Sequence, residues 1–259
     1  MKLASPDTYA KRLVASVQDY ALLAGQAIRN IFTRPFYSTD TIAQMDYIGV
    51  GSLPIVILTG FFTGCVLALQ SATSLKEFGA IEMTGRLVTL SMVKELGPVL
   101  TGLMVSGRNA SGMASELGSM KVTEQIDAMR ALGTDPIRKL VTPRLIATVA
   151  MLFFLTILSD ACGILGGSVV SIVLLKLNGS AFFHTGYMSL RYGDVIEGLT
   201  KPLFSGFIVA TIGCYYGLRT TGGTRGVGKS TTQAVVASSV LIILCDFIVT
   251  QMMIDIFGR

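Results

Sequence analysis

The first long apolar stretch of the chain, residues 48–72, contains no charged residue. A helix rises about 1.5 Å per residue, so a helix of this length can cross the roughly 30 Å hydrocarbon core of a bilayer. The whole chain is 51% hydrophobic and 14% charged, whereas ordinary globular domains have roughly 45–50% and 25%. The sequence therefore predicts an integral membrane protein.

Four more apolar stretches follow, and the five together predict an all-α membrane protein with five transmembrane helices. The later spans are expected at about residues 86–111, 145–175, 202–218 and 231–257. The third span is longer than an upright helix requires, so it is expected to tilt or bend.

The segment before the first span has the pattern of an amphipathic helix, which Asp7 is expected to cap and which runs to about Thr33. Its apolar face consists of Leu13, Val17, Ala24, Ile28 and Ile31. We predict that this helix lies in the membrane interface, with packing on a soluble partner as the alternative. No stretch here is typical of a signal peptide. The chain is accordingly divided into an interfacial segment, 1–40, and a transmembrane domain, 41–259.

The positions of lysine and arginine predict the orientation. Connections on one side of the membrane, with Arg108 counted among them, carry fourteen of these residues, and those on the other side, with Lys201, carry six. Cytoplasmic loops are enriched in Lys and Arg, so the amino terminus is expected in the cytoplasm and the carboxyl terminus outside. This topology explains the net charge of +5 better than nucleic-acid binding does, because the charges lie between apolar stretches.

The second span carries Lys94 and Glu95 side by side, with Pro98 shortly after. A charge near the bilayer centre costs about 2.5–3.5 kcal/mol, so this span is expected inside a helix bundle. Pro98 is predicted to kink the helix and to open a cavity beside the charges. Small residues that recur at every fourth position predict close contact with another helix. They are Gly102, Ser106, Ala110, Ala114 and Gly118. These features indicate the working part of a transporter.

Residues 121–133, between the second and third spans, predict a short cytoplasmic helix. Thr123 is its expected N-cap, and Gly133 is its expected end. Ile126, Met129 and Leu132 are expected to share one face, which suits docking into a groove of a partner. A solvated surface helix is the alternative. Further helix starts are expected at Asp135–Pro136 and at Thr142–Pro143.

Several motifs are not expected to form sites. Residues 223–230 match the nucleotide-binding pattern GxxxxGK[ST], but a functional P-loop follows a strand in an α/β domain. We therefore interpret them as a glycine-rich turn in which Ser230 or Thr231 caps the fifth span. The single histidine, His184, is placed in a connection and given a structural role. The four cysteines show neither disulfide nor metal-ligand spacing; they are Cys65, Cys162, Cys214 and Cys245. No catalytic or metal-binding residue is predicted.

The chain resembles the MlaE (YrbE) permeases, the membrane subunits of bacterial ABC transporters that move phospholipids. The resemblance depends on the ELGP motif, the GR-x-x-S/A-x-x-A-x-E-x-G stretch, the TEQIDA helix and the DP and PR dipeptides, which occur in that order. The late GVGKSTTQAVVASS stretch is also similar to the family and explains the apparent P-loop. Together these motifs cover about residues 48–257.

The resemblance implies a homodimer in the bacterial inner membrane, which moves phospholipids between the inner and outer membranes and maintains outer-membrane lipid asymmetry. It implies two MlaF-type ATPase subunits, which hold the ATP and magnesium, so that this chain needs no cofactor and is not an enzyme. A hexamer of MlaD-type MCE proteins and an MlaB-type STAS protein are further implied partners. The ATPases would dock on the coupling helix, at Thr123, Glu124, Ile126, Asp127, Met129, Arg130 and Leu132.

The resemblance also implies a lipid cavity between the two permeases. The matching positions in this chain are Leu67, Gln70, Leu75, Phe78, Lys94, Glu95, Leu96, Lys201 and Asp246. A phospholipid needs an apolar cleft for its tails and a cation near its phosphate, and Lys94 or Lys201 could supply the cation. Glu95 either pairs with Lys94 or acts as a conformational latch, and the sequence does not decide between these roles.

Two other functions compete with lipid transport. One is a membrane-bound NTPase that uses the loop 223–230. The other is an ion-coupled secondary transporter with Asp160 and Asp246 as proton sites. The five spans lack an evident inverted repeat, which disfavours the secondary transporter.

Overall fold

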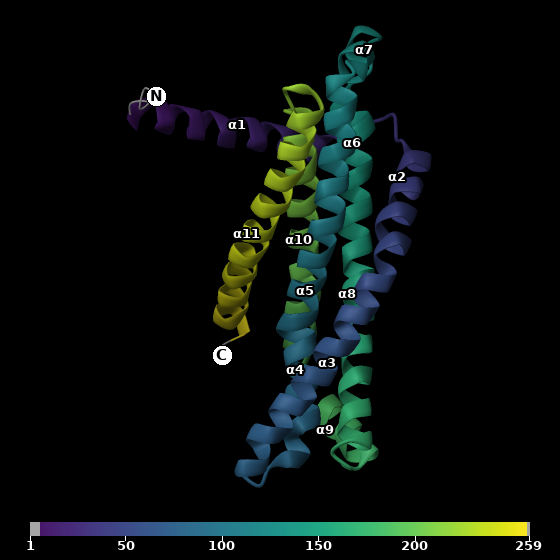
Figure 1. The fold of residues 1–259 in the computed structure, drawn as a ribbon, viewed down its shortest axis with the longest axis vertical. Helices are drawn as coiled ribbons and strands as arrows, with labels where there is room; N and C mark the ends of the chain where they lie inside the picture. The colour runs from purple at the N-terminus through teal and green to yellow at the C-terminus, as the bar shows by residue number, and fades with distance from the viewer. Residues whose placement is uncertain (1–5, 258–259) are drawn as a thin grey trace.

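The computed structural model of the protein describes residues 6–257, and within that range it contains helices and no strand. Figure 1 shows a bundle of long helices with α1 (Pro6–Ile31) lying across one end. The short helix α7 (Gln125–Ala131) projects from the same end, and α9 (Gly179–Ser189) lies at the opposite end. This arrangement confirms the predicted all-α membrane protein with a short helix between its second and third spans.

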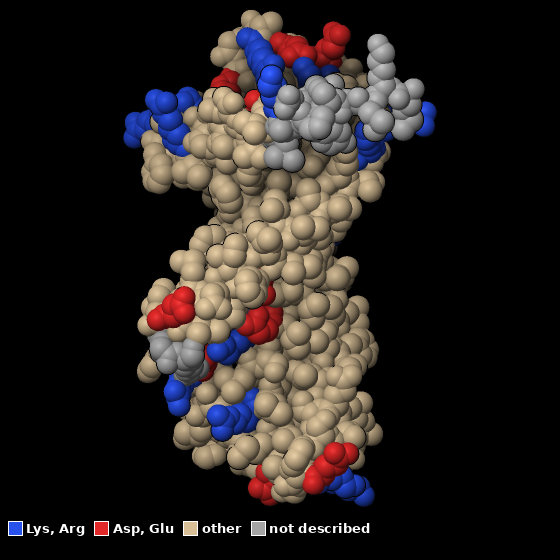
Figure 2. All heavy atoms as spheres, turned by 90° about the vertical axis from the view of Figure 1, so that its left-hand side faces the viewer, with Lys and Arg blue, Asp and Glu red and all other residues tan. Residues whose placement is uncertain are grey.

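Five helices in the described range are long and apolar enough to cross a membrane. They cover Ser38–Glu77, Ile81–Val122, Ile137–Val173, Tyr192–Leu218 and Gly223–Ile256. Figure 2 shows charges gathered at both ends of the molecule and in a further group in its lower half, with a broad uncharged band between them. The number of spans therefore agrees with the prediction, although several boundaries do not.

The first two spans are built from several segments joined by wide π-type turns, and the third begins with such a turn. The first contains α2 (Ser38–Met45) and α3 (Gly51–Glu77). The second contains α4 (Thr84–Ser91), α5 (Gly97–Val105) and α6 (Ser111–Val122). The third contains α8 (Thr142–Val173). The last two spans are the continuous helices α10 (Tyr192–Leu218) and α11 (Gly223–Phe257).

Proline explains three of the four π turns. The turns η1 (Asp46–Val50), η3 (Met92–Leu96) and η5 (Ile137–Val141) each end shortly before a proline, which is Pro54, Pro98 or Pro143 respectively. A proline has no N–H to donate and its ring clashes with the carbonyl four residues earlier, and each of those carbonyls lies in the wide turn. The irregularity expected at Pro98 is thus a π turn that contains Lys94, Glu95 and Leu96. The fourth turn, η4 (Ser106–Ala110), has no proline.

Small residues allow the spans to approach closely, as their spacing predicted. A side chain at Gly64 of α3 would overlap the backbone of Gly163 in α8. A side chain at Gly213 of α10 would contact the backbone of Ala110, and the hydroxyl of Ser106 lies 2.7 Å from that of Ser238 in α11. Lipid tails are as apolar as the helix surfaces, so burial of apolar surface does not drive helices together in a membrane. Close contacts stabilise the bundle through van der Waals packing instead.

The fourth span begins at Tyr192, so the prediction of a mixed connection up to Lys201 is wrong. The side chain of Asp194 accepts a hydrogen bond of 3.0 Å from the backbone N–H of Arg191 and so satisfies a donor at the helix start. The expected connection also contains α9, which carries His184 and is capped by Asn178 through a bond of 2.9 Å to the N–H of Ser180. The charges of this region suggested a loop, but the structure pairs three of them, Asp194, Glu197 and Lys201, with residues of the neighbouring spans.

The fifth span begins at Gly223, which corrects the interpretation of 223–230 as a turn. The reversal occurs just before it, and Gly222 and Gly223 have φ values of 88° and 65°, which suit glycine. Ser230 does not cap the helix; its hydroxyl is buried and lies 2.9 Å from that of Thr220. Because residues 223–230 are helical and follow a helix, they do not form the loop that a P-loop NTPase requires.

At the end that carries α7, two further helix boundaries differ from prediction. Thr123 follows the end of α6, and its hydroxyl bonds to Ser119, while Glu124 precedes α7 with a φ of 59°. Asp135 does cap the next helix, since it accepts the N–H of Ile137 at 2.9 Å. Thr142 starts no new helix, because Ile137–Val173 is continuous.

The helix α1 is anchored to α10 by polar contacts. The hydroxyl of Tyr20 lies 2.9 Å from that of Thr211, and Arg219 forms an ion pair of 2.6 Å with Asp19. The buried positions include Ala24 from the predicted apolar face, but Val17 is 59% exposed. The helix begins at Pro6; the side chains of Asp7 and Leu13 lie outside the described part. The interfacial position of α1 remains a prediction.

Candidate functional site

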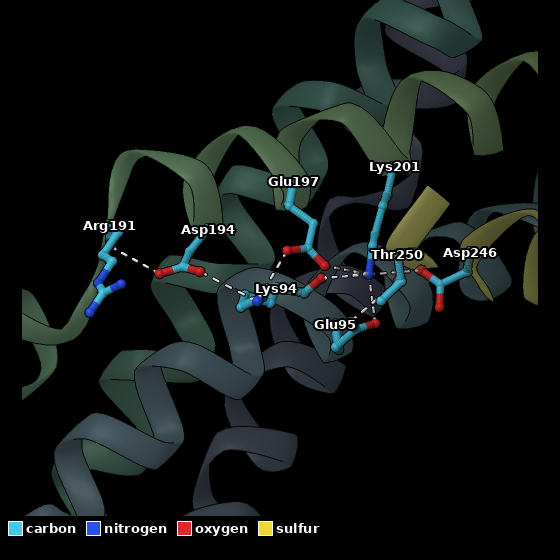
Figure 3. Close-up of polar contacts among 8 residues, drawn as sticks. All are labelled: Lys94, Glu95, Arg191, Asp194, Glu197, Lys201, Asp246 and Thr250. Carbon is cyan, nitrogen blue, oxygen red and sulfur yellow. Dashed lines mark hydrogen bonds and ion pairs between the residues drawn. The ribbon is translucent and has the colours of Figure 1, made fainter. Parts of the chain in front are cut away.

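A cluster of charges joins the second, fourth and fifth spans inside the bundle (Figure 3). Lys94, on η3, forms ion pairs with Glu197 at 3.1 Å and with Asp194 at 3.3 Å, both on α10. The two carboxylate side chains are nearly buried, with exposed fractions of 6% and 2%. Lys94 therefore fastens the π turn to the first turns of α10.

Lys201 is the centre of the other half of the cluster. Its side chain is 2% exposed, and its ammonium lies 2.6 Å from Glu95 and 3.2 Å from Asp246 on α11. It also donates a hydrogen bond of 2.9 Å to the carbonyl of Lys94. Thr250 of α11 donates a longer bond of 3.4 Å to Glu95. The single buried ammonium of Lys201 thus connects three spans. Lys201 belongs to the helix α10, whereas the prediction of membrane orientation counted it in an outer connection.

The neighbours Lys94 and Glu95 do not pair with each other as one prediction proposed. The π turn directs Lys94 toward α10 at Glu197, whereas Glu95 meets Lys201. With formal charges, the two lysines of the cluster face four carboxylates, Glu95, Asp194, Glu197 and Asp246. In this conformation the two lysines are therefore neutralised by acids and offer little net attraction to a phosphate.

An apolar groove lies on the other side of the second span. It has a volume of about 480 Å³, and its lining includes Leu67 and Gln70 of α3 together with Leu96 of η3. Phe62 and Val66 add exposed apolar surface. The structure thus brings three of the predicted lipid contacts together. Apolar walls with a few polar groups are typical of sites for apolar ligands.

A second cavity, of about 360 Å³, lies on the side of the cluster that faces α10. Its lining includes Lys94, Asp194 and Glu197, with Tyr192 and Met253 beside them. Since Lys94 lines this cavity and Leu96 lines the groove, the π turn presents neighbouring residues to two different spaces.

Five predicted contacts line neither space. Glu95, Lys201 and Asp246 are held in the charge cluster, and two others lie farther away. Leu75 is at the end of α3, and Phe78 follows it in the connection with 83% of its surface exposed. Neither residue lines the groove or the cavity beside Lys94. Their contact with lipid remains a prediction.

The sequence did not predict three charged residues that make polar contacts between the spans. Asp194 and Glu197 were missed because the region was assigned to a connection. Arg108 was counted in a cytoplasmic loop, but it lies in η4, within the second span, and donates bonds of 3.0 Å to the carbonyl of Tyr47 and the hydroxyl of Ser52. The signal that could have identified Arg108 is its place inside the ladder of small residues.

Asp160, named in the proton-coupled alternative, is 8% exposed on α8 and lies against Gly97. One of its carboxylate oxygens is buried without a hydrogen-bond partner among the described residues. Asp246, the other acid of that alternative, pairs with Lys201. The two acids therefore differ in environment and do not form one site.

The short helix α7 presents part of the predicted docking face. Ile126 is buried and Met129 is half-buried, but Leu132 follows the helix and is 84% exposed, so the three residues do not share one face. Asp127 forms a 2.7 Å ion pair with Lys121. The hydrogen bond from Lys121 and the nearby charge of Arg130 lower the pKa of Asp127.

Comparison with known proteins identifies similar chains. The family model described as Permease MlaE matches residues 41–252. The chain is 42% identical over 245 residues to a probable ABC transporter permease protein of Rickettsia typhi, covering 95% of each chain. It is 41% identical to a probable ABC transporter permease protein of Synechocystis, covering 94% of this chain and 91% of the relative. It is 36% identical to the intermembrane phospholipid transport system permease protein MlaE of Haemophilus influenzae, covering 82% of each chain.

Proposed function

Because this chain belongs to the MlaE permease family, and so is a transporter membrane subunit and not an enzyme, we propose that it moves phospholipids between the inner and outer membranes of a bacterium. A separate ATPase subunit supplies the energy. The relative from Haemophilus influenzae is named as a phospholipid transport permease, and the relative from Rickettsia typhi is named as a probable ABC transporter permease. The proposed role of the whole system is to maintain lipid asymmetry of the outer membrane.

The groove formed by Leu67, Gln70 and Leu96 is the observation that carries the proposal. Its walls come from two spans and are mainly apolar, which suits acyl chains, because apolar surface gains free energy when it leaves water. The groove borders the π turn that carries Lys94 and Glu95. Movement of that turn would therefore reach both the lipid tails and the charge cluster.

The charge cluster gives the proposal a conformational element. Lys201 holds the second and fifth spans against α10 through Glu95 and Asp246. Glu95 is 40% exposed, so it is the member of this pairing that solvent or a lipid headgroup reaches most readily. We assign it the role of a latch that opens when the dimer changes state, since an ion pair between two helices holds only one of their arrangements.

The proposed assembly contains a second copy of this chain and two MlaF-type ATPases. The ATPases dock at α7, where Ile126 is anchored in the protein and Leu132 is 84% exposed to a partner. An MlaD-type MCE hexamer and an MlaB-type STAS protein complete the assembly. The proposed location is the inner membrane, with α1 and α7 on the cytoplasmic side. Both helices lie at one end of the bundle in Figure 1, which supports this orientation.

The experiment that tests the groove compares two matched phenylalanines. Phe62 lines the groove and is 59% exposed, whereas Phe154 on α8 lies outside it and is 61% exposed. Phe62→Asn is expected to lower phospholipid transfer between vesicles by the reconstituted complex, and to reduce the lipid retained on purification. Phe154→Asn should leave both unchanged. Equal transfer by the two variants would refute the groove as the lipid site.

A further inference from the structure

A cavity of about 410 Å³ lies between α4 and α9, at the end of the molecule opposite α7. Its polar lining includes Arg86 of α4, His184 of α9 and Arg191, which precedes α10. Among the described residues that line it there is no aspartate or glutamate. Two guanidinium groups that face one cavity without a lining acid make a strongly basic site.

The walls of this cavity are held by close helix packing. A side chain at Gly85 would overlap the carbonyl of Phe182 on α9, and one at Gly186 would approach the hydroxyl of Thr89 on α4. The two helices therefore meet backbone to backbone next to Arg86. This contact fixes the helices that carry Arg86 and His184 and gives the site a preformed shape.

The two arginines are unlike the lysines of the charge cluster. Neither Arg86 nor Arg191 forms an ion pair with any residue in the described range 6–257. The backbone N–H of Arg191 is used by Asp194, but its guanidinium points away from the cluster (Figure 3). Guanidinium groups that form no ion pair among the described residues remain available for an anionic ligand.

The hydroxyl groups of the site are already committed as donors. Thr185 donates to the carbonyl of Ala181 at 2.8 Å, and Ser189 donates to that of Gly186 at 2.6 Å. Their protons therefore point into α9. The donors left for a ligand are the guanidinium groups and the imidazole, and arginine binds phosphate oxygens through two parallel hydrogen bonds.

We propose that Arg86 and Arg191 bind the phosphate of a phospholipid headgroup in this cavity. The inference deepens the proposed function and rests on it. Arg191 also lines the neighbouring cavity that contains Lys94 and Glu197. A headgroup held by Arg191 therefore lies at the entrance to the charge cluster, and the arginines supply the positive charge that the acid-paired lysines do not.

The test uses the purified complex and two double variants with the same change of charge. Arg86→Gln with Arg191→Gln removes the site. Lys76→Gln with Lys176→Gln removes two exposed charges at the same end, outside the cavity. The probes are dihexanoyl phosphatidylglycerol, dihexanoylglycerol, which lacks the phosphate, and inorganic phosphate, each titrated and followed by native mass spectrometry.

The wild type and the lysine variant are expected to bind the phosphatidylglycerol more tightly than the other two probes. The arginine variant should bind it about tenfold more weakly or worse, which corresponds to the loss of one charged hydrogen-bonded contact. Unchanged affinity in the arginine variant, or an equal loss in the lysine variant, would overturn the inference. So would equal binding of dihexanoylglycerol or of inorganic phosphate.

Two further outcomes separate the inference from its premise. If the arginine variant keeps its lipid affinity but loses a co-purifying protein subunit, the arginines bind an acidic protein and the lipid assignment is wrong. If the wild type neither binds nor transfers phospholipid, the proposed function itself fails. If the wild type does both and the arginine variant matches it, only the cavity inference fails.

Discussion

The lysines inside the spans and the arginines at the end of the bundle have opposite surroundings. Lys201 is 2% exposed and lies within 3.2 Å of both Glu95 and Asp246. Arg86 and Arg191 instead face a cavity whose lining, in the described part of the chain, has no acid. The difference indicates that the buried cations join helices, because an unpaired charge in an apolar interior is costly. Cations at the end of a span reach water and can remain free for a ligand.

The largest effect that tests this comparison is expected from Lys201→Met. The change leaves Glu95, Asp246 and Glu197 together without their shared ammonium, and breaking a buried pair in this way costs about 3–5 kcal/mol. Thermal unfolding of the purified protein measures the loss. Arg86→Gln is the matched control and should stay within about 0.5 kcal/mol of the wild type, as exposed substitutions do. If the two variants are equally stable, the buried lysine does not hold the spans together.

Reversal of the charge at Glu95 should affect transport more than stability. Glu95→Lys places a second ammonium beside that of Lys201, and like charges in contact cost several kcal/mol. Because Glu95 is 40% exposed, the new side chain can turn toward solvent, so the protein is expected to assemble. Lipid transfer between reconstituted vesicles should be abolished while the partner subunits still co-purify. Normal transfer would show that the latch assignment is wrong.

Glu95→Gln sharpens the same point with a smaller change. The amide keeps the shape of the carboxylate and can still accept a hydrogen bond from Lys201, but it lacks the charge. A partial decrease in lipid transfer is expected, smaller than that of Glu95→Lys. A decrease as large as that of Glu95→Lys would indicate that transport requires the negative charge of Glu95, and that a hydrogen bond to Lys201 of the same shape is not enough.

The smallest effect is expected at Asp127, whose ion pair with Lys121 is exposed on α7. The pKa of Asp127 is lowered in the folded protein, so its stabilising contribution is present above the pKa of an unfolded carboxyl, about 3.9. It is lost as the pH falls through the lower folded value. Asp127→Asn should change thermal stability only slightly, and added salt should reduce the difference. A salt-independent loss as large as that of Lys201→Met would contradict the distinction between buried and exposed pairs.

The sequence predicted the architecture because hydrophobic length and residue size are local properties. The charge-free run 48–72 lies within the first span, and the small residues at Ser106 and Ala110 do contact other helices. Leu67, Gln70 and Leu96 were predicted through a family resemblance, and the structure places them in one groove. The lipid contacts themselves remain predictions.

Ion-pair partners were not predictable in the same way. The contact between Glu95 and Lys201 joins two helices that are distant in the chain, and no local pattern specifies it. The charges of Asp194 and Glu197 made a helix start resemble a loop, and the glycines of 223–230 made a helix resemble a turn. Asp194 in fact favours the helix start, because acidic residues suit a helix N-terminus. At 223–230, glycine disfavours a helix locally, and packing such as the contact between Ser230 and Thr220 stabilises it.

The sequence by itself determined that this chain crosses the membrane in five helices, because the length of each apolar run sets whether it spans a bilayer. Only the tertiary structure decided which charges neutralise one another and which remain free. Lys94 and Leu96, two residues apart in the π turn before Pro98, line separate spaces, and Lys94 meets its acids on α10. Charge pairing depends on the tertiary structure because two charges interact according to the distance between them. That distance is set by the packing of helices that are far apart in the chain.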